Sequence, residues 1–205
     1  GHGHGMQMEM DDRCVSWLPW YHDMGLVGCF LSLIANQISG DYLKTEDFAR
    51  RPLAWLDLIS RNPGDTISFS PTFGYDICSR RVSSQTHVSE RFDLSRWRLA
   101  GNGADMIRPD VMQNFVNVFA DAGFSADSFM PSYGLAESTL CVTLMPPGEG
   151  IHVELVAEER LSGKPRDLNR PARYRAIVNC GKAMRGMKVE VRGESGTKNG
   201  GALAD

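Results

Sequence analysis

The chain has 205 residues, of which 42% are hydrophobic and 23% are charged. This composition is typical of a globular protein that buries a core, and it excludes a disordered or fibrous chain. The formal net charge is −3, with 22 lysines and arginines against 25 aspartates and glutamates, so the whole chain has no electrostatic preference for nucleic acid or an anionic membrane. Any nucleotide is therefore expected to be held by a local site.

The start of the chain, its apolar runs and its cysteines predict a cytoplasmic protein without a membrane span. The longest apolar run, residues 25–38, is interrupted by polar residues and is too short to cross a bilayer. Residues 1–13 lack a signal-peptide pattern and are typical of an expression tag or a disordered start. The cysteines are odd in number, widely spaced and without a Cys-x-x-Cys pair, so we expect reduced thiols. They are Cys14, Cys29, Cys78, Cys141 and Cys180.

Extended and helical segments alternate in the first third of the chain. Residues 14–18 are extended, and the apolar run 24–38 after them is expected to form a buried helix that Gly40 ends. A second helix is predicted over residues 52–61, which begin with proline and carry apolar residues at helical spacing. Residues 66–70 are again extended and predict a strand.

The same alternation continues in the middle of the chain. A turn is expected over residues 71–74 and a helix over residues 75–82. Residues 97–100 predict a strand that the glycines of residues 101–103 break, and residues 109–122 predict an amphipathic helix. The apolar stripe of that helix comprises Val111, Phe115, Val118 and Phe119. This alternation predicts an α/β fold with a mostly parallel sheet, flanking helices, and loops gathered at the carboxyl ends of the strands.

The pattern changes near residue 147, so we expect an α/β unit over residues 14–147 and a β-rich segment over residues 148–205. Residues 193–201 resemble a hairpin loop without a return strand, and the chain is therefore expected to be truncated at its C-terminus. The extended pieces predicted in the β-rich segment are residues 151–156, 174–179 and 187–191.

One motif combines an aromatic ring, a glycine and a carboxylate. Tyr133 and Gly134 are followed by Glu137, on a turn after an apolar stretch. The ring suits a nucleotide base, the glycine allows close approach, and the carboxylate suits a hard cation such as Mg²⁺. The alternative is a helix start with Glu137 in its first turn and Tyr133 as a packing residue. These residues alone leave both interpretations open.

Other loops carry groups that are suited to binding. His22, in a loop before Asp23, can orient a carboxylate or line a pocket, or it can be satisfied locally. The glycines of residues 101–105 suit a base or phosphate, although a lone Gly-x-Gly is a weak signal. Phe73 and Tyr75 can wall an apolar ligand or pack in the core. No Gly-x-Ser-x-Gly motif or diagnostic histidine-cysteine spacing is present, which argues against a hydrolase triad.

Taken in chain order, these motifs resemble those of the adenylate-forming enzymes, and most closely those of the fatty acyl-AMP ligases. The resemblance covers nearly the whole chain from about Cys14 onward and corresponds to a central fragment of the large N-terminal domain. The stretches that carry it are residues 16–28, 70–78, 101–105, 131–140 and 179–182.

The resemblance implies that a fatty acid reacts with ATP, with Mg²⁺ as cofactor, to give an acyl adenylate and pyrophosphate, and that the acyl group then passes to an acyl carrier protein. The implied catalytic groups are His22, beside the acyl carboxylate, and Glu137, as the Mg²⁺ ligand. Tyr133 would stack on adenine. The implied nucleotide-binding residues are Gly101, Asn102, Gly103, Ala104, Ser132, Tyr133, Gly134 and Ala136, and the implied acyl-binding residues are His22, Met24, Gly25, Phe73 and Tyr75.

The chain departs from the family pattern at Ala136, where many adenylate-forming enzymes carry threonine, and at Asp105, where glutamate is frequent. The family's phosphate loop and its C-terminal domain with a catalytic lysine are expected outside this chain, so the fragment itself is expected to be inactive. Two alternatives stay open. One is a fragment of an acyl-CoA synthetase, with coenzyme A as acceptor, and the other is a non-catalytic module that binds nucleotide or acyl groups.

Overall fold

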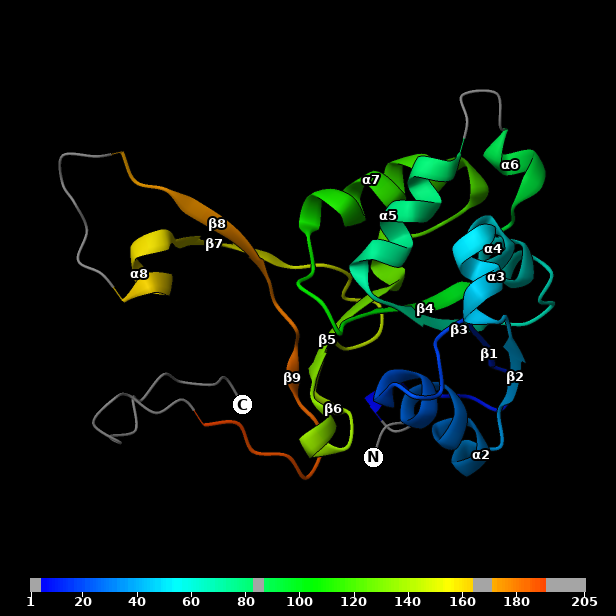
Figure 1. The fold of residues 1–205 in the computed structure, drawn as a ribbon, viewed down its shortest axis with the longest axis horizontal. Coiled ribbons are helices and arrows are strands. Elements are labelled where there is room, and N and C mark those ends of the chain that lie inside the picture. The colour runs from blue at the N-terminus through cyan, green and yellow to red at the C-terminus, as the bar shows by residue number, and fades with distance from the viewer. Residues whose placement is uncertain (1–4, 83–86, 164–170, 191–205) are drawn as a thin grey trace.

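A seven-stranded sheet forms the centre of the protein (Figure 1). The computed structural model describes residues 5–82, 87–163 and 171–190. The strands of the sheet lie in the order β2-β1-β3-β4-β5-β6-β9. Their bounds are Arg13–Ser16 for β1, Ser39–Tyr42 for β2, Thr66–Ser70 for β3, Trp97–Asn102 for β4, Phe129–Gly134 for β5, Cys141–Leu144 for β6 and Lys182–Ala183 for β9.

The first five strands of the sheet are parallel. β1 pairs with both β2 and β3, and the parallel pairing continues from β3 to β4 and from β4 to β5. β6 and β9 join the edge beyond β5 in antiparallel pairing. The direction of strand order reverses between β1 and β3, and open α/β sheets bind ligands outside the carboxyl ends of their strands near such a reversal. The prediction of an α/β fold with a mostly parallel sheet is confirmed.

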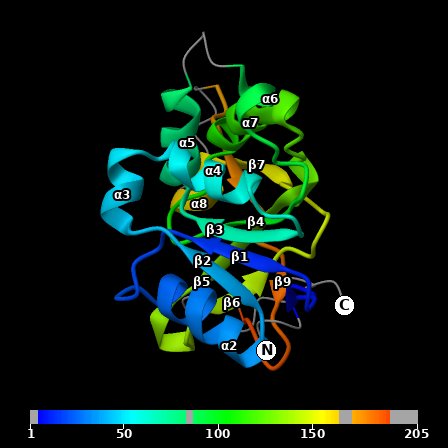
Figure 2. The same cartoon turned by 90° about the vertical axis from the view of Figure 1, so that its right-hand side faces the viewer.

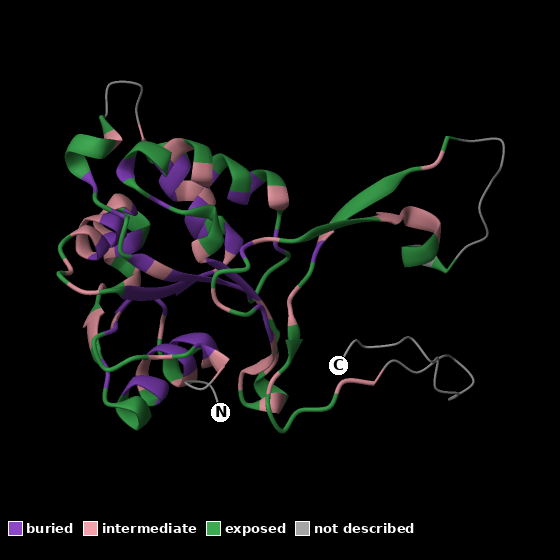
Figure 3. Cartoon of the chain, turned by 180° about the vertical axis from the view of Figure 1, so that it is seen from behind, coloured by how far each residue is buried: buried purple, intermediate pink, exposed green. Residues whose placement is uncertain are grey.

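Helices cover both faces of this sheet (Figure 2). The π-helix η1 (Met24–Leu31) and α2 (Ser32–Asn36) lie on one face. The helices on the other face are α3 (Thr45–Arg50), α4 (Leu53–Ser60), α5 (Thr72–Arg81), α6 (Val88–Arg91) and α7 (Pro109–Phe119). Buried residues concentrate in the sheet and on the helix surfaces that pack against it (Figure 3). Among the described residues, every helix is too short or too polar to serve as a membrane span.

An aromatic cluster fills the core between α4, α5, α7 and the sheet. The fully buried ring of Tyr75 has centroid distances of 5.5 Å to Trp55, 5.1 Å to Phe115 and 5.4 Å to Phe129. The Tyr75 hydroxyl donates a hydrogen bond of 2.8 Å to the carbonyl oxygen of Gly101 in β4. Burial raises the pKa of Tyr75 well above its ordinary value, so the hydroxyl remains protonated and able to donate. Tyr75 therefore ties α5 to β4.

Several helix boundaries differ from the sequence-based expectation. The apolar run 24–38 forms η1 and α2 and ends at Asn36, because Gln37 adopts a left-handed backbone with φ of 57°. Gly40, which was expected to end this helix, lies in β2, a short strand without a clear sequence pattern. The expected turn over residues 71–74 is the start of α5, which begins at Thr72.

Strand boundaries differ as well. Gly101 and Asn102 do not break the strand before them but belong to β4, where their backbones pair with β3 and β5. In the amphipathic helix α7, Val118 is only half-buried, while Met112 is buried beside Val111, Phe115 and Phe119. Residues 187–190 are not a strand, and residues 191–201, with the predicted hairpin loop, lie outside the described residues.

The β-rich segment is divided between two sheets. β7 (Val153–Ala157) and β8 (Tyr174–Val178) form an antiparallel ribbon that extends away from the main sheet together with α8 (Glu158–Ser162), as Figure 1 shows. β9 returns to the main sheet, so residues on both sides of position 147 share it. The division into units 14–147 and 148–205 stays a prediction. In the expected tag or disordered start, Met6 and Asp12 are buried, and residues 1–4 lie outside the described residues.

Replacement of Tyr75 by phenylalanine tests the hydrogen bond between α5 and β4. The ring packing is retained, but the buried carbonyl of Gly101 loses its donor, so we expect the free energy of unfolding to fall by about 1–3 kcal/mol. Urea denaturation followed by circular dichroism measures this change. The control is Tyr174→Phe on β8, where the side chain is exposed and a change below about 0.5 kcal/mol is expected. Equal losses in the two variants would contradict the assignment.

Candidate functional site

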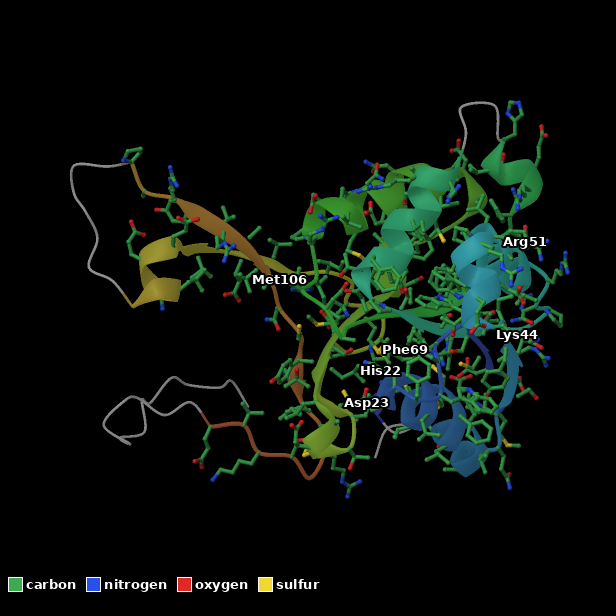
Figure 4. All side chains as sticks on the ribbon, viewed as in Figure 1. His22, Asp23, Lys44, Arg51, Phe69 and Met106 are labelled. Carbon is green, nitrogen blue, oxygen red and sulfur yellow. The ribbon has the colours of Figure 1, made fainter. Side chains whose placement is uncertain are left out.

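Loops that follow β1, β4 and β5 open onto one cavity of about 380 Å³. Each loop leaves the carboxyl end of a parallel strand, so the pairing of the sheet brings them to the same edge. His22 and Asp23 come from the loop after β1, and Phe69 comes from β3 (Figure 4). The two motifs that stand far apart in the sequence, around His22 and around Tyr133, therefore meet in one cavity.

The His22 loop is a tight turn that leads directly into η1. The His22 N–H donates to the Pro19 carbonyl over 3.2 Å, and the Leu26 N–H donates to the His22 carbonyl over 2.9 Å. A Cβ atom at Gly25 would lie 2.2 Å from the Pro19 carbonyl oxygen, so the turn requires glycine there. Gly25 therefore shapes the loop and lies outside the cavity lining, whereas Met24 is part of it.

The imidazole of His22 is held through Nδ1. This atom accepts a hydrogen bond of 3.1 Å from the Met24 N–H and lies 2.8 Å from Asp23 Oδ1. The Met24 N–H also lies 2.8 Å from Asp23 Oδ1, which caps the start of η1. The described residues offer no hydrogen-bond partner to Nε2 of His22, and the side chain is 49% exposed. His22 thus lines the cavity as a half-exposed imidazole whose Nε2 is unpaired within the described part of the chain.

Asn102, the last residue of β4, fixes the start of the loop that follows this strand. Its side chain is fully buried, with Nδ2 donating to the Ser70 carbonyl over 3.4 Å and Oδ1 accepting from the Thr72 hydroxyl over 3.4 Å. The Ser132 hydroxyl donates to the Asn102 carbonyl over 3.2 Å. These contacts join the ends of β3, β4 and β5. Asn102 therefore positions the site and is not part of the cavity lining.

Gly103 and Ala104 pass close to β5. A Cβ atom at Gly103 would lie 2.8 Å from the Ser132 hydroxyl oxygen and 3.0 Å from the Ser132 carbonyl oxygen. Ala104 has a φ of 69°, which is uncommon outside glycine. Backbone strain of this kind is concentrated at binding sites in proteins. The loop thereby places Ala104 in the cavity lining beside Tyr133.

Asp105, the residue that replaces the frequent glutamate, caps α5. Its Oδ1 accepts a hydrogen bond of 2.8 Å from the Thr72 N–H, and the Thr72 hydroxyl donates to the Met106 carbonyl over 3.3 Å. The first N–H groups of a helix have no partner within the helix, so a carboxylate satisfies them and favours the helix dipole. The shorter side chain at this position thus fixes the loop to α5.

The end of β5, just before the turn to β6, places Tyr133 at the cavity. Tyr133 is 55% exposed, so it is a strand residue facing outward and not a core packing residue. A Cβ atom at Gly134 would lie 1.8 Å from the Leu140 carbonyl oxygen, so the hairpin closes only with glycine there. Glu137 lies in the one-turn 3₁₀ helix η4 (Ala136–Ser138), is exposed, and lies outside the cavity lining.

His22 is the one basic side chain and Asp23 the one acidic side chain in the described lining of this cavity. The other titratable side chains there are two phenols, Tyr21 and Tyr133, and the thiol of Cys141. Burial raises the pKa of Cys141 to about 11, and the thiol donates to the Thr143 carbonyl over 3.2 Å. Cys141 is therefore a protonated thiol at neutral pH and not a thiolate nucleophile.

The metal-ligand prediction depends on Glu137 alone. Within the part of the chain that the structure describes, no three histidine, cysteine, aspartate or glutamate side chains are grouped to hold a metal ion. One exposed carboxylate fits a Mg²⁺ ion that keeps several waters and binds substrate phosphates. A single carboxylate is too few for an ion whose ligands all come from the protein.

The cavity brings together much of the predicted site. The predicted residues in its lining are His22, Met24, Ala104, Ser132, Tyr133, Gly134 and Ala136. Gly25, Gly101, Asn102 and Gly103 lie outside the lining and shape the loops and strands around it.

Phe73 and Tyr75, the two aromatic residues predicted to line the acyl-binding part of the site, lie outside the cavity lining. Tyr75 belongs to the buried aromatic core, which is the alternative that the sequence left open. Phe73 is 53% exposed and packs edge-on against Trp17, with ring centroids 5.7 Å apart. Neither side chain belongs to the described cavity lining.

The sequence pattern does not reveal several lining residues. Phe69 belongs to a strand that is buried throughout, so nothing in the sequence separates a cavity-facing ring from a core ring. A Cβ atom at Gly101 would lie 1.8 Å from the Phe69 ring, so the missing side chain at Gly101 makes room for it. The other unpredicted lining residues are Tyr21, Asp23, Gly28, Leu135, Leu140, Cys141 and Leu144.

A second cavity of about 390 Å³ adjoins the first. The two share Ala104, Ser132, Tyr133 and Gly134, so Tyr133 and the strained Ala104 loop border both spaces. Residues 176–178 of β8 contribute to the second cavity.

Comparison with known proteins assigns the family. The family model described as "AMP-binding enzyme" matches residues 2–201, and the chain belongs to this family. A solved structure from work on fatty acyl-adenylate ligases of E. coli and L. pneumophila superposes with a TM-score of 0.84 at 42% identity, over 96% of this chain and 36% of that one. A fatty acyl-adenylate ligase from L. pneumophila, in complex with acyl adenylate and pyrophosphate, gives a TM-score of 0.77 at 33% identity, over 88% of this chain and 32% of that one.

Curated relatives are similar over nearly the whole chain. A putative acyl-CoA synthetase of Caulobacter vibrioides is 47% identical over 94% of this chain and 34% of its own length. The medium-chain-fatty-acid–[acyl-carrier-protein] ligase JamA of Moorena producens is 36% identical over 88% of this chain and 31% of its own length. The chain thus spans about a third of the length of these relatives. The resemblance to fatty acyl-AMP ligases is confirmed.

Substitution of Asp105 tests the cap that holds the loop after β4. Asp105→Ala removes the acceptor of the Thr72 N–H, so we expect the free energy of unfolding to fall by about 0.5–2 kcal/mol. Asp105→Asn keeps an acceptor oxygen and is expected to retain most of the stability. Chemical denaturation of both variants measures the difference, with Asp121→Ala at an exposed site as the control. A loss in Asp105→Asn as large as in Asp105→Ala would contradict a capping role.

Proposed function

We propose that the protein is part of a ligase that activates a fatty acid with ATP to an acyl adenylate and pyrophosphate. The observation that carries the proposal is the single cavity in which the His22 loop meets the Tyr133 strand and the Ala104 loop. Such a cavity can hold a carboxylate and a nucleotide side by side, which the reaction requires because a carboxylate oxygen attacks the α-phosphorus. The L. pneumophila structure with acyl adenylate and pyrophosphate supports the proposal.

The nucleotide side of the proposed site is formed by the loop after β4 and by β5. The exposed ring of Tyr133 would stack on adenine, and the close backbone of Gly103 and Ala104 would lie against the other face of the base. Ser132 and Gly134 line the cavity on the same strand, and the methyl side chain of Ala136 contributes no hydrogen bond to a phosphate.

Glu137 is proposed as the Mg²⁺ ligand of the site. When bound, Mg²⁺ would neutralise charge on the phosphates and on the leaving pyrophosphate. Glu137 follows the lining residue Ala136 and is exposed on a short turn. Both observations support a role in which its carboxylate reaches the phosphates through solvent-accessible space. The remaining ligands would come from water and from the nucleotide.

The acyl side of the proposed site is formed by η1, β3 and β6. His22 would contact the carboxylate of the acid, and Met24 would contact its chain. Apolar side chains continue the lining beyond them, among them Phe69, Leu140 and Leu144. Burial of a methylene chain against such side chains stabilises the complex by about 0.8 kcal/mol per CH₂ group. The position of Tyr75 in the core argues against a role in this wall.

For the acceptor, we propose an acyl carrier protein, because relatives with that acceptor in their names are 36% and 40% identical to this chain. Coenzyme A is the second candidate, since the 47% identical relative is named a putative acyl-CoA synthetase. Transfer from a preformed acyl adenylate to a pantetheine-bearing carrier protein, compared with transfer to coenzyme A, separates the two candidate acceptors.

The five free cysteines support a reducing, cytoplasmic setting.

Binding of a non-hydrolysable acyl adenylate tests the proposed function. We expect a decanoyl sulfamoyl adenosine to bind to the chain in calorimetry, and Tyr133→Ala to weaken binding about 5- to 150-fold through loss of stacking worth about 1–3 kcal/mol. The matched control is Tyr174→Ala, because Tyr174 is exposed to a similar degree, 59% against 55%, and lies outside both cavities. Binding that is unchanged in Tyr133→Ala would favour a module that uses another surface.

A further inference from the structure

Gly28 borders the cavity from the interior of a helix. η1 continues directly into α2, so position 28 lies within one helical segment over residues 24–36. The backbone of Gly28 is outside the left-handed region, so a residue with a side chain can adopt it. Glycine destabilises a helix interior relative to alanine. The local backbone therefore gives no reason for glycine at this position.

Other helical glycines have a reason in their packing. A Cβ atom at Gly25 would overlap the Pro19 carbonyl oxygen, and one at Gly74 would overlap the Ser70 hydroxyl oxygen. Neither position can take a side chain without movement of the chain around it. Gly28 differs from both, because no backbone atom lies among the contacts that an added Cβ atom would make.

The contacts of an added Cβ atom at Gly28 are with two flexible side chains. The atom would lie 3.1 Å from Cδ2 of Leu140 and 4.0 Å from Cγ of Met24. Met24, Leu140 and Gly28 itself all line the cavity of about 380 Å³. A side chain at position 28 would therefore occupy cavity space or push Leu140 into it. In either case less of the cavity would remain for a ligand.

This space lies on the proposed acyl side of the cavity. Along the chain, the lining passes from the imidazole of His22 to the thioether of Met24 and then to Gly28, all on the loop before η1 or on η1 itself. An acid with its carboxylate at His22 would extend its alkyl chain along η1 toward Gly28. Apolar side chains there favour burial of such a chain over exposure to water.

We infer that Gly28 is a specificity-determining residue, whose missing side chain admits an alkyl chain that a larger residue would exclude. The inference rests on the proposed function and deepens it, because it assigns the substrate class as acids whose alkyl chain is long enough to reach η1. The alternative is that Gly28 serves only to let Leu140 pack closely against η1. The two differ in which ligands a substitution affects.

Calorimetry with two non-hydrolysable adenylates tests the inference in Gly28→Leu. Displacement of two methylene groups would weaken binding of decanoyl sulfamoyl adenosine about 15-fold, at about fourfold per buried CH₂ group. Acetyl sulfamoyl adenosine has no methylene chain to displace, so its affinity is expected to change by less than about twofold. Retained binding of the acetyl analogue also shows that the variant is folded.

The outcomes for Gly28→Leu separate the inference from the proposed function. Unchanged binding of the decanoyl analogue would overturn the inference, and so would equal losses for the two analogues, which a general packing defect produces. Both of these outcomes leave the proposed function intact. Absence of binding of both analogues to the unmodified chain would contradict the proposed function itself.

Gly28→Ala covers the case in which leucine prevents folding. One methyl group displaces about one methylene group, so the decanoyl analogue is expected to bind about fourfold more weakly, with the acetyl analogue unaffected. The matched control is Ala35→Leu, which adds bulk on the exposed surface of α2 and is expected to leave both affinities unchanged. A decanoyl affinity in Gly28→Ala equal to that of the unmodified chain would overturn the inference.

A second substitution distinguishes lost space from lost packing. In Gly28→Leu combined with Leu140→Ala, the smaller residue at position 140 returns space to the cavity, so decanoyl affinity is expected to recover by about tenfold relative to Gly28→Leu. If close packing of Leu140 were the reason for glycine, removal of the Leu140 side chain would not restore preference for the longer ligand. A decanoyl affinity that stays low or falls further in the double variant would overturn the inference.

Discussion

The ends of β3, β4 and β5 lie in register, and the site depends on this alignment. Asn102 pairs with Ser70 on one side and with Pro131 on the other, so the loops that follow these strands begin at the same level of the sheet. The buried amide of Asn102 and the Ser132 hydroxyl reinforce the alignment with hydrogen bonds between the three strands. A shift of one residue would turn each side chain to the other face of the sheet and would remove the shared cavity.

Close backbone contacts then bring the loops into the positions that the chemistry needs. Gly25, Gly103 and Gly134 each stand where an added Cβ atom would meet a backbone or side-chain oxygen within 2.8 Å. Glycine at these positions contributes no functional group, yet it lets the His22 loop and the β5–β6 hairpin close and lets the loop after β4 approach β5. The groups that would contact substrate are therefore few, and the surrounding residues act mainly through position.

Much of this arrangement could be predicted from the sequence, because it follows from local patterns. The strand over residues 66–70 and the helix that begins at Pro109 have the apolar spacing and helix-start signal that define such elements. The order of the motifs, together with parallel pairing, predicts that their loops share one edge of the sheet. His22, Tyr133 and the Ala104 loop meet there as expected.

The rest depends on contacts between residues that are distant in the sequence. Tyr75 and Phe69 are both aromatic and both close to a strand end, but only tertiary packing makes Tyr75 a core residue and Phe69 a cavity residue. The cap that Asp105 provides to α5 joins residues 33 positions apart, so no local pattern reveals it.

The central claim is that one cavity of this chain holds both the acyl carboxylate and the nucleotide. The most direct test is a crystal structure of the chain with decanoyl sulfamoyl adenosine. The account predicts adenine stacked on the Tyr133 ring and the acyl carbonyl region within hydrogen-bond distance of Nε2 of His22, with the alkyl chain beside Phe69. Adenine bound away from Tyr133, or an acyl group in a cavity that does not include His22, would contradict it.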